Sequence, residues 1–251
     1  MYEERKINIL NKLSHNHITT VSELSNLLGV SPATVRRDLT TMENSGLLTK
    51  THGGAILNED VSDSLNYKKK QTKNYELKLK IAKKAAELIN DGDIVSINSS
   101  TITSLMPQFI TAQNITIVTN SLNIAYEMQS HDNCNLIILG GTYMSKAQTI
   151  EGATTVNQIK NMRYKKAFLG ANGIDLNFGF STASELEQSS KIATMEQSDQ
   201  TIFLCEHTKF NRCSLHKICN LKDAYTLITD SLVEEEVVEP YKVDINVILA
   251  D

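Results

Sequence analysis

Two adjacent arginines, Arg36 and Arg37, could contact nucleic acid. The arginine guanidinium binds phosphate and can donate two hydrogen bonds to O6 and N7 of guanine in the DNA major groove. In residues 31–39, the apolar Val35 and Leu39 recur at helical spacing and are expected to face a core, so both arginines turn to the opposite side. The pattern predicts a helix with a short, basic, exposed face.

This helix has a typical start, and a partner helix precedes it. Ser31 followed by Pro32 favours a helix N-terminus, because serine can accept from a free first-turn N–H and proline has no N–H to satisfy. Upstream, Thr20 and Glu23 have the spacing of a capping box, and Gly29 ends the helix that they begin. Such a unit places its second helix in the DNA major groove, although an ordinary capped helical hairpin has the same periodicity.

The residues that follow favour the first of these interpretations. Gly46 ends the helix, and residues 47–55 have the pattern of a strand, a glycine turn and a return strand, which is the wing of a winged helix. With a first helix over residues 3–14, they predict a DNA-binding domain over residues 1–57. The residues expected to contact DNA are Ser31, Ala33, Thr34, Arg36, Arg37, Lys50, His52 and Gly53.

Residues 58–74 are polar and then basic, which predicts a linker, and a second domain is expected over residues 75–251. In this domain, helical segments alternate with short apolar runs, which predicts an α/β fold with a mostly parallel sheet. The expected strands are 94–97, 115–118, 136–139, 166–169, 201–205, 226–229 and 243–249. The expected helices are 76–89, 103–109, 122–129, 154–162, 183–197 and 233–239.

Ligands bind such sheets at the loops beyond the carboxyl ends of the strands. Here those loops share hydroxyls, amides and glycines: they are 98–101, 119–121, 140–142 and 170–173. The first is rich in hydroxyls and leads into a predicted helix N-terminus, which suits an anion. Polar residues at loop starts are usually helix caps, so the ligand site is inferred from four loops at one sheet edge rather than from any single loop.

Composition limits the class of protein. The chain has 251 residues, 41% of them apolar and 22% charged, which is typical of a globular protein of one or two domains. It has no run of 18 apolar residues, and its first residues are charged, so neither a membrane span nor a signal peptide is expected. Four cysteines without a CxxC pair fit reduced thiols. These features predict a cytoplasmic protein.

The charge of the DNA-binding domain predicts self-association. Residues 1–57 hold six basic and five acidic side chains, a net charge of +1, while the whole chain carries −4. One module with so little positive charge gains little affinity from phosphate contacts, so two or more copies are expected to act together. We therefore expect a homo-oligomer, either a dimer or a tetramer.

The N-terminal residues resemble a known family at two places. Residues 30–39 match the pattern V-S-x-x-T-[VI]-R-R-D-L without a gap, and residues 52–55 match the wing sequence H-G-G-A. Both are signatures of the DeoR family of bacterial sugar-metabolism repressors. The resemblance implies double-stranded operator DNA as a partner and repression as the mode of regulation.

The resemblance covers almost the whole chain, from residue 3 to about 249, and includes the family's sensor domain. That domain is similar in fold to ribose-phosphate isomerases and typically senses a phosphorylated sugar. The resemblance implies that loop 98–101 holds phosphate and that Lys78, Asn120, Glu187 and Lys209 add polar contacts. The expected effector-binding residues, from loops and resemblance together, are Lys78, Asn98, Ser99, Ser100, Thr101, Asn120, Gly140, Gly141, Asn172, Glu187 and Lys209.

The first loop departs from the family pattern D-S-G-T-T, because residues 98–102 read N-S-S-T-I. Ser100 stands where the family has a glycine, and its Cβ disfavours a positive φ. If the loop needs a positive φ at this position, we expect a strained backbone at Ser100. If it does not, we expect the backbone amides of the loop to point in other directions than in the family pattern. Glu206 likewise stands where aspartate is usual.

Two other classes of function were weighed. Cysteines and histidines at 205, 207, 213, 216 and 219 could bind zinc, but no CxxC bracket is present and Cys205 ends a predicted buried strand. An isomerase-like fold could also process sugar phosphates, with Glu187 as general base, but this would leave the winged helix without a role. The sequence therefore predicts a transcriptional regulator with a small-molecule effector, no enzyme activity, no cofactor and no metal.

Overall fold

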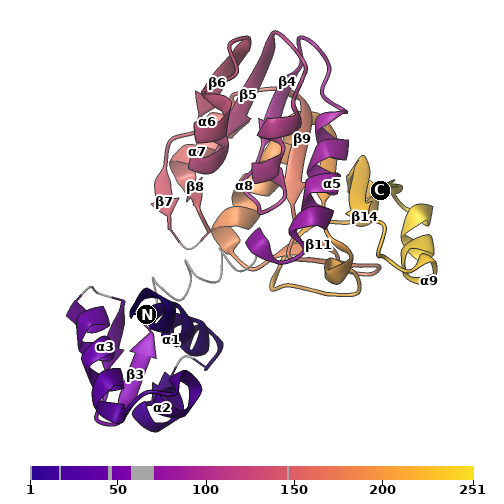
Figure 1. The fold of residues 1–251 in the computed structure, drawn as a ribbon. Helices are drawn as coiled ribbons and strands as arrows, with labels where there is room; N and C mark the ends of the chain where they lie inside the picture. The colour runs from indigo at the N-terminus through magenta and orange to yellow at the C-terminus, as the bar shows by residue number, and fades with distance from the viewer. Residues whose placement is uncertain (1, 17, 45–46, 58–70, 146) are drawn as a thin grey trace. The chain divides into compact units, whose positions relative to one another are not determined.

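The computed structural model describes residues 2–16, 18–44, 47–57, 71–145 and 147–251. The chain forms two compact units, Met1–Lys70 and Gln71–Asp251 (Figure 1). Residues 71–74, placed in the linker from sequence, group with the second unit. The rest of the expected linker, 58–70, lies outside the described residues, so the domain boundaries at 57 and 75 stay predictions.

The N-terminal unit is a winged helix, as predicted. Thr20 caps α2 in a capping box with Glu23, and Gly29 ends the helix in the left-handed conformation with φ 63°. The predicted helix end at Gly46 lies outside the described residues. The elements are α1 (Tyr2–Asn16), β1 (Ile18–Thr20), α2 (Val21–Leu28), α3 (Pro32–Asn44), β2 (Leu48–Lys50) and β3 (Gly54–Leu57), with the antiparallel sheet order β1-β3-β2.

One apolar cluster holds this unit together. It takes side chains from all three helices and from the wing, and so fixes the tilt of α3 against the other two helices. Its members are Ile9, Leu13, Leu24, Val35, Leu39, Met42, Leu48 and Ala55. Val35 and Leu39 are therefore inward-facing, as their spacing predicted.

The larger unit contains a parallel sheet of seven strands at the seven predicted places, with ends that differ by up to three residues. The order is β15-β14-β12-β9-β4-β5-β6, and every neighbouring pair is parallel. This confirms the predicted α/β class. The strands are β4 (Ile94–Ile97), β5 (Ile115–Thr119), β6 (Cys134–Ile138), β9 (Tyr164–Gly170), β12 (Ser198–Leu204), β14 (Thr226–Asp230) and β15 (Asn246–Ala250).

The helices around the sheet are α5 (Tyr75–Ala86), α6 (Leu122–Met128), α7 (Ala153–Lys160), α8 (Glu185–Glu196) and α9 (Glu235–Val238). Two predictions were wrong in type or length. Residues 103–109 form two 3-10 turns, Thr103–Leu105 and Pro107–Phe109, and the helix predicted over 233–239 shortens to α9 before a 3-10 turn. Proline explains both, because Pro107 and Pro240 lack the N–H that an α-helix needs and their rings clash with the carbonyl of the preceding turn.

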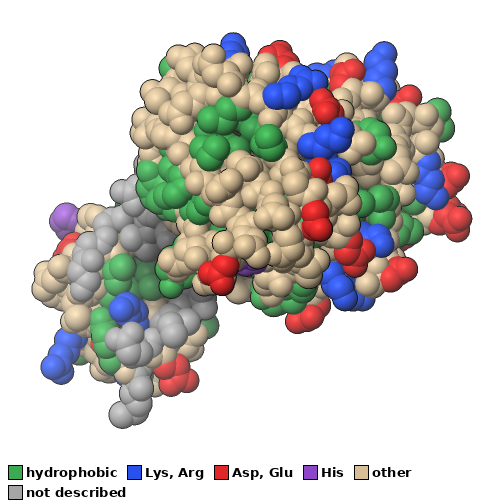
Figure 2. All heavy atoms as spheres, turned by 90° about the horizontal axis from the view of Figure 1, so that it is seen from above, with side chains coloured by type: hydrophobic (Ala, Val, Ile, Leu, Met, Phe, Trp, Pro, Cys, Tyr) green, Lys and Arg blue, Asp and Glu red, His purple; other side chains and the backbone are tan. Residues whose placement is uncertain are grey.

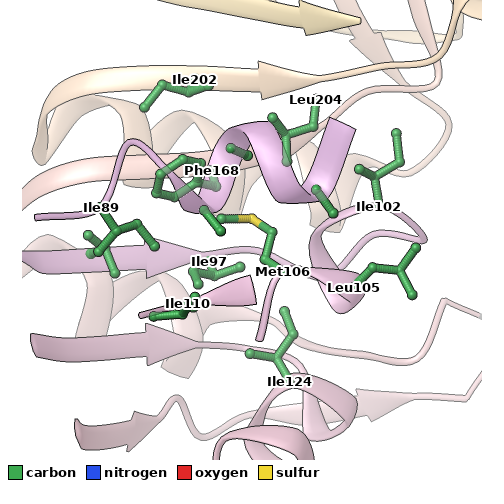
Figure 3. Close-up of a cluster of buried hydrophobic side chains, with 14 of the residues drawn as sticks. Ile89, Ile97, Ile102, Leu105, Met106, Ile110, Ile124, Phe168, Ile202 and Leu204 are labelled. Carbon is green, nitrogen blue, oxygen red and sulfur yellow. The ribbon is translucent and has the colours of Figure 1, made fainter. Parts of the chain in front are cut away.

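Both faces of the sheet are covered, as a parallel sheet requires. On one face, Met106 and the α6 residue Ile124 pack with Ile97 and Phe168 of the strands in a single cluster (Figure 3). Ile81 of α5 belongs to the same cluster. The opposite face divides into two clusters, one that includes side chains of α7 and α8 and one that includes β10, β11 and β13. In the described ranges, no helix is both long enough and apolar enough to cross a bilayer.

Five short strands were not predicted. They are β7 (Thr142–Met144), β8 (Thr149–Glu151), β10 (Gly173–Asp175), β11 (Gly179–Thr182) and β13 (His216–Cys219), in the sheets β7-β8 and β10-β11-β13. Strands of three or four residues are too short to show a period of two, so their sequences carry no clear signal. Two of them, β8 and β11, nevertheless supply side chains to the site described below.

Candidate functional site

The recognition helix α3 has the exposed basic face that its sequence predicted. The Ser31 hydroxyl accepts from the Thr34 amide at 3.2 Å and so caps the helix. Arg36 and Arg37 are exposed, and within the described residues neither makes an ion pair. Their charges are therefore available to a phosphate or a base edge.

The other predicted DNA-contact residues differ in availability. Ala33, His52 and Gly53 are exposed, while Thr34 is half-buried and shares a hydrogen bond with the Ser31 hydroxyl at 2.9 Å. Lys50 is also exposed, but its ammonium donates to Thr40 Oγ1 at 2.9 Å and lies 3.7 Å from a carboxylate oxygen of Glu43. Lys50 must leave these partners before it can reach DNA.

Asp38, within the arginine-rich motif, has a structural role that the sequence did not reveal. It is buried and accepts two hydrogen bonds from Arg5, from Nε at 2.7 Å and from Nη2 at 3.1 Å. The Asp38 carboxylate raises the pKa of Arg5. This bidentate ion pair ties α1 to the buried side of α3.

The two wing glycines have different roles. A Cβ on Gly54 would lie 1.9 Å from the Thr19 carbonyl oxygen, because Gly54 pairs with Thr20 in the adjacent strand. A Cβ on Gly53 would meet nothing within 4 Å. Gly54 is therefore needed for the close approach of β1 and β3, whereas Gly53 has space for a side chain or a ligand.

In the larger unit, the predicted ligand loops meet where the strand order reverses. The chain passes from β4 to β5 and β6 on one side, and then from β9 outward on the other, so β4 and β9 flank the switch point. The Asn98 amide donates to the Phe168 carbonyl at 3.0 Å, and Ser100 packs against the Cα of Gly170. The loops after these two strands therefore lie together at the place where α/β sheets bind ligands.

Ser100 is not strained. Its φ is not positive, and its hydroxyl accepts from the amides of Ile102 at 3.3 Å and Thr103 at 3.0 Å. Backbone strain at Ser100 is therefore excluded. The amides of Ile102 and Thr103, which were expected to bind an anion, point to the Ser100 hydroxyl instead. The expected α-helix is also absent here, so no α-helical macrodipole acts on this loop.

Asn120, after β5, is the centre of a buried hydrogen-bond network. Its Oδ1 accepts from Asn98 Nδ2 at 3.3 Å and from the Ser99 amide at 3.2 Å. Its Nδ2 donates to Thr149 Oγ1 at 2.8 Å and to Glu151 Oε1 at 3.1 Å. The amide thus connects the loop after β4 with the hairpin β7-β8.

Glu151 was not predicted as a site residue. It is 1% exposed, and burial raises the pKa of its carboxyl to about 7, with a smaller contribution from the nearby Glu187. The sequence did carry a signal for Glu151, because it is the one charged residue in segment 147–159. Its position next to Asn120 depends on the hairpin, which the sequence did not predict.

A second polar group lies close to Glu151. Glu187, near the start of α8, accepts from Lys191 Nζ at 3.0 Å and from the Thr182 hydroxyl at 2.9 Å. The same hydroxyl lies 3.1 Å from Asn172 Oδ1. The charges of Glu187 and Lys191 both influence the Glu151 carboxyl, so the two groups of side chains are adjacent. Lys191, which is buried, was not in the predicted site.

The third group contains the predicted Lys78 and Lys209. Lys78 is 1% exposed, and its ammonium donates to the Lys73 carbonyl at 2.7 Å. Burial lowers the pKa of Lys78, and the positive charge of Lys209 lowers it further, while Glu206 opposes both effects. The charges of Lys209, Lys191 and Glu206 all act on the buried Cys205 thiol, which places this group beside the previous one.

Gly140 and Gly141 form the turn before β7, between α7 and the backbone of Glu151. The Gly140 amide donates to Gln158 Oε1 at 3.1 Å, and its carbonyl accepts from Thr155 at 2.8 Å, so this turn is tied to α7. Gly141 has φ 153°, and a Cβ there would lie 2.2 Å from Thr155 Oγ1. These glycines permit the close approach of a turn to a helix. Thr101 is half-buried beside the Asn98 loop.

The cysteines and histidines considered for zinc are spread over several segments, with His216 and Cys219 at the two ends of β13. Cys205 follows β12 and is buried, His207 Nδ1 is hydrogen-bonded to Asp230 Oδ1 at 2.8 Å, and Cys213 is exposed in a loop. Among the residues that the structure describes, no three His, Cys, Asp or Glu side chains form a group that could hold a metal ion.

Comparison with known proteins assigns both units. The model of the DeoR-like helix-turn-helix domain matches residues 5–61, and that of the DeoR C terminal sensor domain matches residues 73–231. The chain belongs to the DeoR family. The predicted resemblance is confirmed, and this DeoR-family protein is a DNA-binding transcriptional regulator with a sensor domain.

Relatives of this DeoR-family regulator match over nearly their full length. The HTH-type transcriptional repressor GlcR of Bacillus subtilis (strain 168) is 32% identical over 92% of this chain and 89% of that protein. The lactose phosphotransferase system repressor of Lactococcus lactis subsp. lactis is 30% identical over 100% of both chains. These relatives are named as regulators rather than enzymes, which counts against the isomerase alternative.

Solved structures with similar architecture include an enzyme and a regulator. Ribose 5-phosphate isomerase A from Methanocaldococcus jannaschii has a TM-score of 0.39 and 16% identity, over 54% of each chain. The full-length sorbitol operon regulator SorC from Klebsiella pneumoniae has a TM-score of 0.35 and 12% identity, over 80% of this chain and 88% of that chain.

Proposed function

We propose that this DeoR-family regulator represses a sugar uptake or catabolism operon in the cytoplasm and is released from DNA by a phosphorylated sugar. The observation that carries the proposal is the convergence of polar and charged side chains at the switch point of the sensor sheet. Lys78, Lys191 and Lys209 can attract phosphate, while Asn120 and Glu187 belong to a network that can recognise hydroxyls. Relatives named as sugar-related repressors support this choice of effector.

On DNA, α3 lies in the major groove in this proposal. Arg37 reads a base edge or grips phosphate, and Arg36, nearer the helix flank, grips phosphate. The exposed wing residues His52 and Gly53 contact the neighbouring backbone. The low net charge of the N-terminal unit makes a single copy a weak binder, so a homo-oligomer holds two winged helices on repeated half-sites.

The larger unit offers surface for this self-association. Figure 2 shows hydrophobic side chains gathered in patches on its viewed face, between scattered charges of both signs. The edge strand β6 carries no charged residue and exposes Ile137 and Ile138 by 40% and 48%. Uncharged edges with exposed apolar side chains are suited to pairing with another chain.

Effector binding must favour the arrangement that does not fit the operator, because a ligand shifts an equilibrium only by its difference in affinity between two states. The Asn74 side chain, which precedes α5, donates to Glu206 in the effector site at 3.0 Å. Residues 71–74 thereby join the site to the segment that leads to the DNA-binding unit. We propose that effector contacts near Lys78 and Glu206 move residues 71–74 and so change the spacing of the two winged helices in the oligomer.

A release assay tests the proposal. The full chain is bound to its own upstream DNA, and ribose 5-phosphate, glucose 6-phosphate and fructose 6-phosphate are titrated beside their free sugars. A footprint over two half-sites and release by a sugar phosphate are expected. Release by the free sugars alone would contradict the phosphorylated effector. Turnover of a sugar phosphate that is lost in Glu187→Ala would instead favour an enzyme.

A further inference from the structure

Two buried oxygen atoms in the effector site have no hydrogen-bond partner. They are Asn98 Oδ1 and Glu151 Oε2, on side chains that are 5% and 1% exposed. The Ser190 hydroxyl lies close enough to the Glu151 carboxyl to lower its pKa, but its single hydrogen is donated to the Glu187 carbonyl at 3.1 Å. Buried polar atoms are nearly always paired, and an unpaired one costs about 1–3 kcal/mol. Two of them beside the same asparagine therefore suggest a partner that binds there.

The identity of these atoms is fixed by their surroundings. Asn120 Nδ2 donates to the Ile150 carbonyl at 3.2 Å and to Glu151 Oε1, so its Oδ1 must face Asn98. That oxygen accepts from Asn98 Nδ2, and a reversed Asn98 amide would set two oxygens against each other. Asn98 therefore presents an oxygen to the unpartnered side, and it requires a donor.

The missing partner must suit both oxygens. A dianionic phosphate oxygen is an acceptor only and cannot pair with the Asn98 carbonyl oxygen or with ionised Glu151. A hydroxyl can donate its one hydrogen to either oxygen, so two hydroxyls satisfy both, and a hydroxyl can also accept from the carboxyl when Glu151 is protonated. Because the pKa of Glu151 is raised to about 7, both forms are present near neutral pH, and a hydroxyl serves each of them.

We propose that Asn98 and Glu151 form a hydroxyl-binding subsite that accepts hydrogen bonds from two hydroxyls of a sugar or polyol effector. The inference rests on the proposed function and specifies which part of the effector these residues recognise. Phosphate then lies toward the ammonium groups of Lys78 and Lys209, and the hydroxyls lie toward Asn120. In this assignment Asn98 binds sugar rather than phosphate.

The test compares two variants with a matched control. Glu151→Met removes both carboxyl oxygens at similar volume, and Asn120 Nδ2 keeps its bonds to Thr149 and Ile150. Asn98→Ala removes the other oxygen, and Asn120 Oδ1 keeps the Ser99 amide. Glu127→Met makes the same replacement at an exposed position on α6 and serves as control. Thermal unfolding of each full-length variant checks that it folds.

Calorimetry measures the affinity of each full-length protein for ribose 5-phosphate, glucose 6-phosphate, fructose 6-phosphate, their free sugars and inorganic phosphate. We expect each site variant to weaken binding of the preferred sugar phosphate roughly tenfold, which is the effect of losing one hydrogen bond to a charged or buried group. The affinity for inorganic phosphate should not change. Equal weakening of inorganic phosphate, or no weakening at all, would overturn the subsite, since the oxygens would then be structural or filled by water.

The outcomes also separate this inference from the proposed function. If parent protein binds sugar phosphates no more tightly than inorganic phosphate, the subsite is wrong and the phosphorylated effector stands. If it prefers free sugars and the variants lose that preference, the subsite stands and the phosphorylated effector is wrong. A parent that binds none of these probes would overturn both.

Discussion

Replacing Glu151 by glutamine should change how the stability of the larger unit depends on pH. Burial raises the pKa of this carboxyl from 4.5 to about 7, so the folded state holds a proton that the unfolded state has released at intermediate pH. Its stabilising contribution is complete below pH 4.5 and is lost as pH rises through 7. The full loss is roughly 3 kcal/mol, because each pKa unit is worth about 1.4 kcal/mol.

Glutamine resembles the protonated acid and does not titrate, so the variant lacks this loss. The free energy of unfolding of the variant, relative to that of the parent, should therefore rise by roughly 2–3 kcal/mol between pH 5 and pH 8. Urea unfolding followed by circular dichroism measures it, since the chain has no tryptophan.

Other titrating groups are common to both proteins and cancel in the difference. Glu127→Gln, at an exposed position, should show no such trend and is the control for the chemical change. If the difference between Glu151→Gln and the parent stayed constant from pH 5 to pH 8, the raised pKa would be wrong. The hydroxyl subsite would then lose its argument from two protonation states, although not the two unpaired oxygens.

Three further predictions concern the winged helix. Arg37→Ala should weaken operator binding by about 1–3 kcal/mol in a mobility-shift titration at fixed salt, and an equal loss on random DNA would show a phosphate contact rather than base reading. Gly54→Ala should lower the free energy of unfolding of the N-terminal unit by about 1–3 kcal/mol or more, because the new Cβ would meet a backbone oxygen. Gly53→Ala should change it by no more than about 0.5 kcal/mol. Equal effects of the two variants in thermal unfolding would refute the distinction. Asp38→Asn should lower the unfolding midpoint of the same unit by breaking the Arg5 ion pair, and an unchanged midpoint would contradict that role.

The proposed effector site shows what local sequence patterns could not predict. The sequence placed Asn98 and Asn172 at loop starts, but the order of strands decides that β4 and β9 are neighbours and that their loops meet. Strand order depends on long-range packing, which no local pattern encodes. Glu151 and Lys191 were missed for the same reason, since they join the site through a short hairpin and a helix that approach from elsewhere in the chain.

Ser100 shows how a substitution can be accommodated. From sequence, a serine in place of glycine implied either a strained loop or redirected amides. The tertiary structure shows redirected amides, because the Ser100 hydroxyl accepts from two amides of the following turn. The Ser100 side chain fits because residue 170 is glycine, and a Cβ at position 170 would collide with it.

The sequence by itself determined the elements whose signals are local. The capping box at Thr20, the helix start at Ser31 and the apolar spacing of Val35 and Leu39 each act within one or two turns of helix, so the helix-turn-helix could be predicted residue by residue. The seven strands of the parallel sheet were likewise predicted from their apolar runs. Tertiary structure alone decided which charges are neutralised, for example Asp38 by Arg5, and which buried oxygens remain unpaired. Ion pairs and unpaired atoms depend on side chains that are brought together from distant parts of the chain.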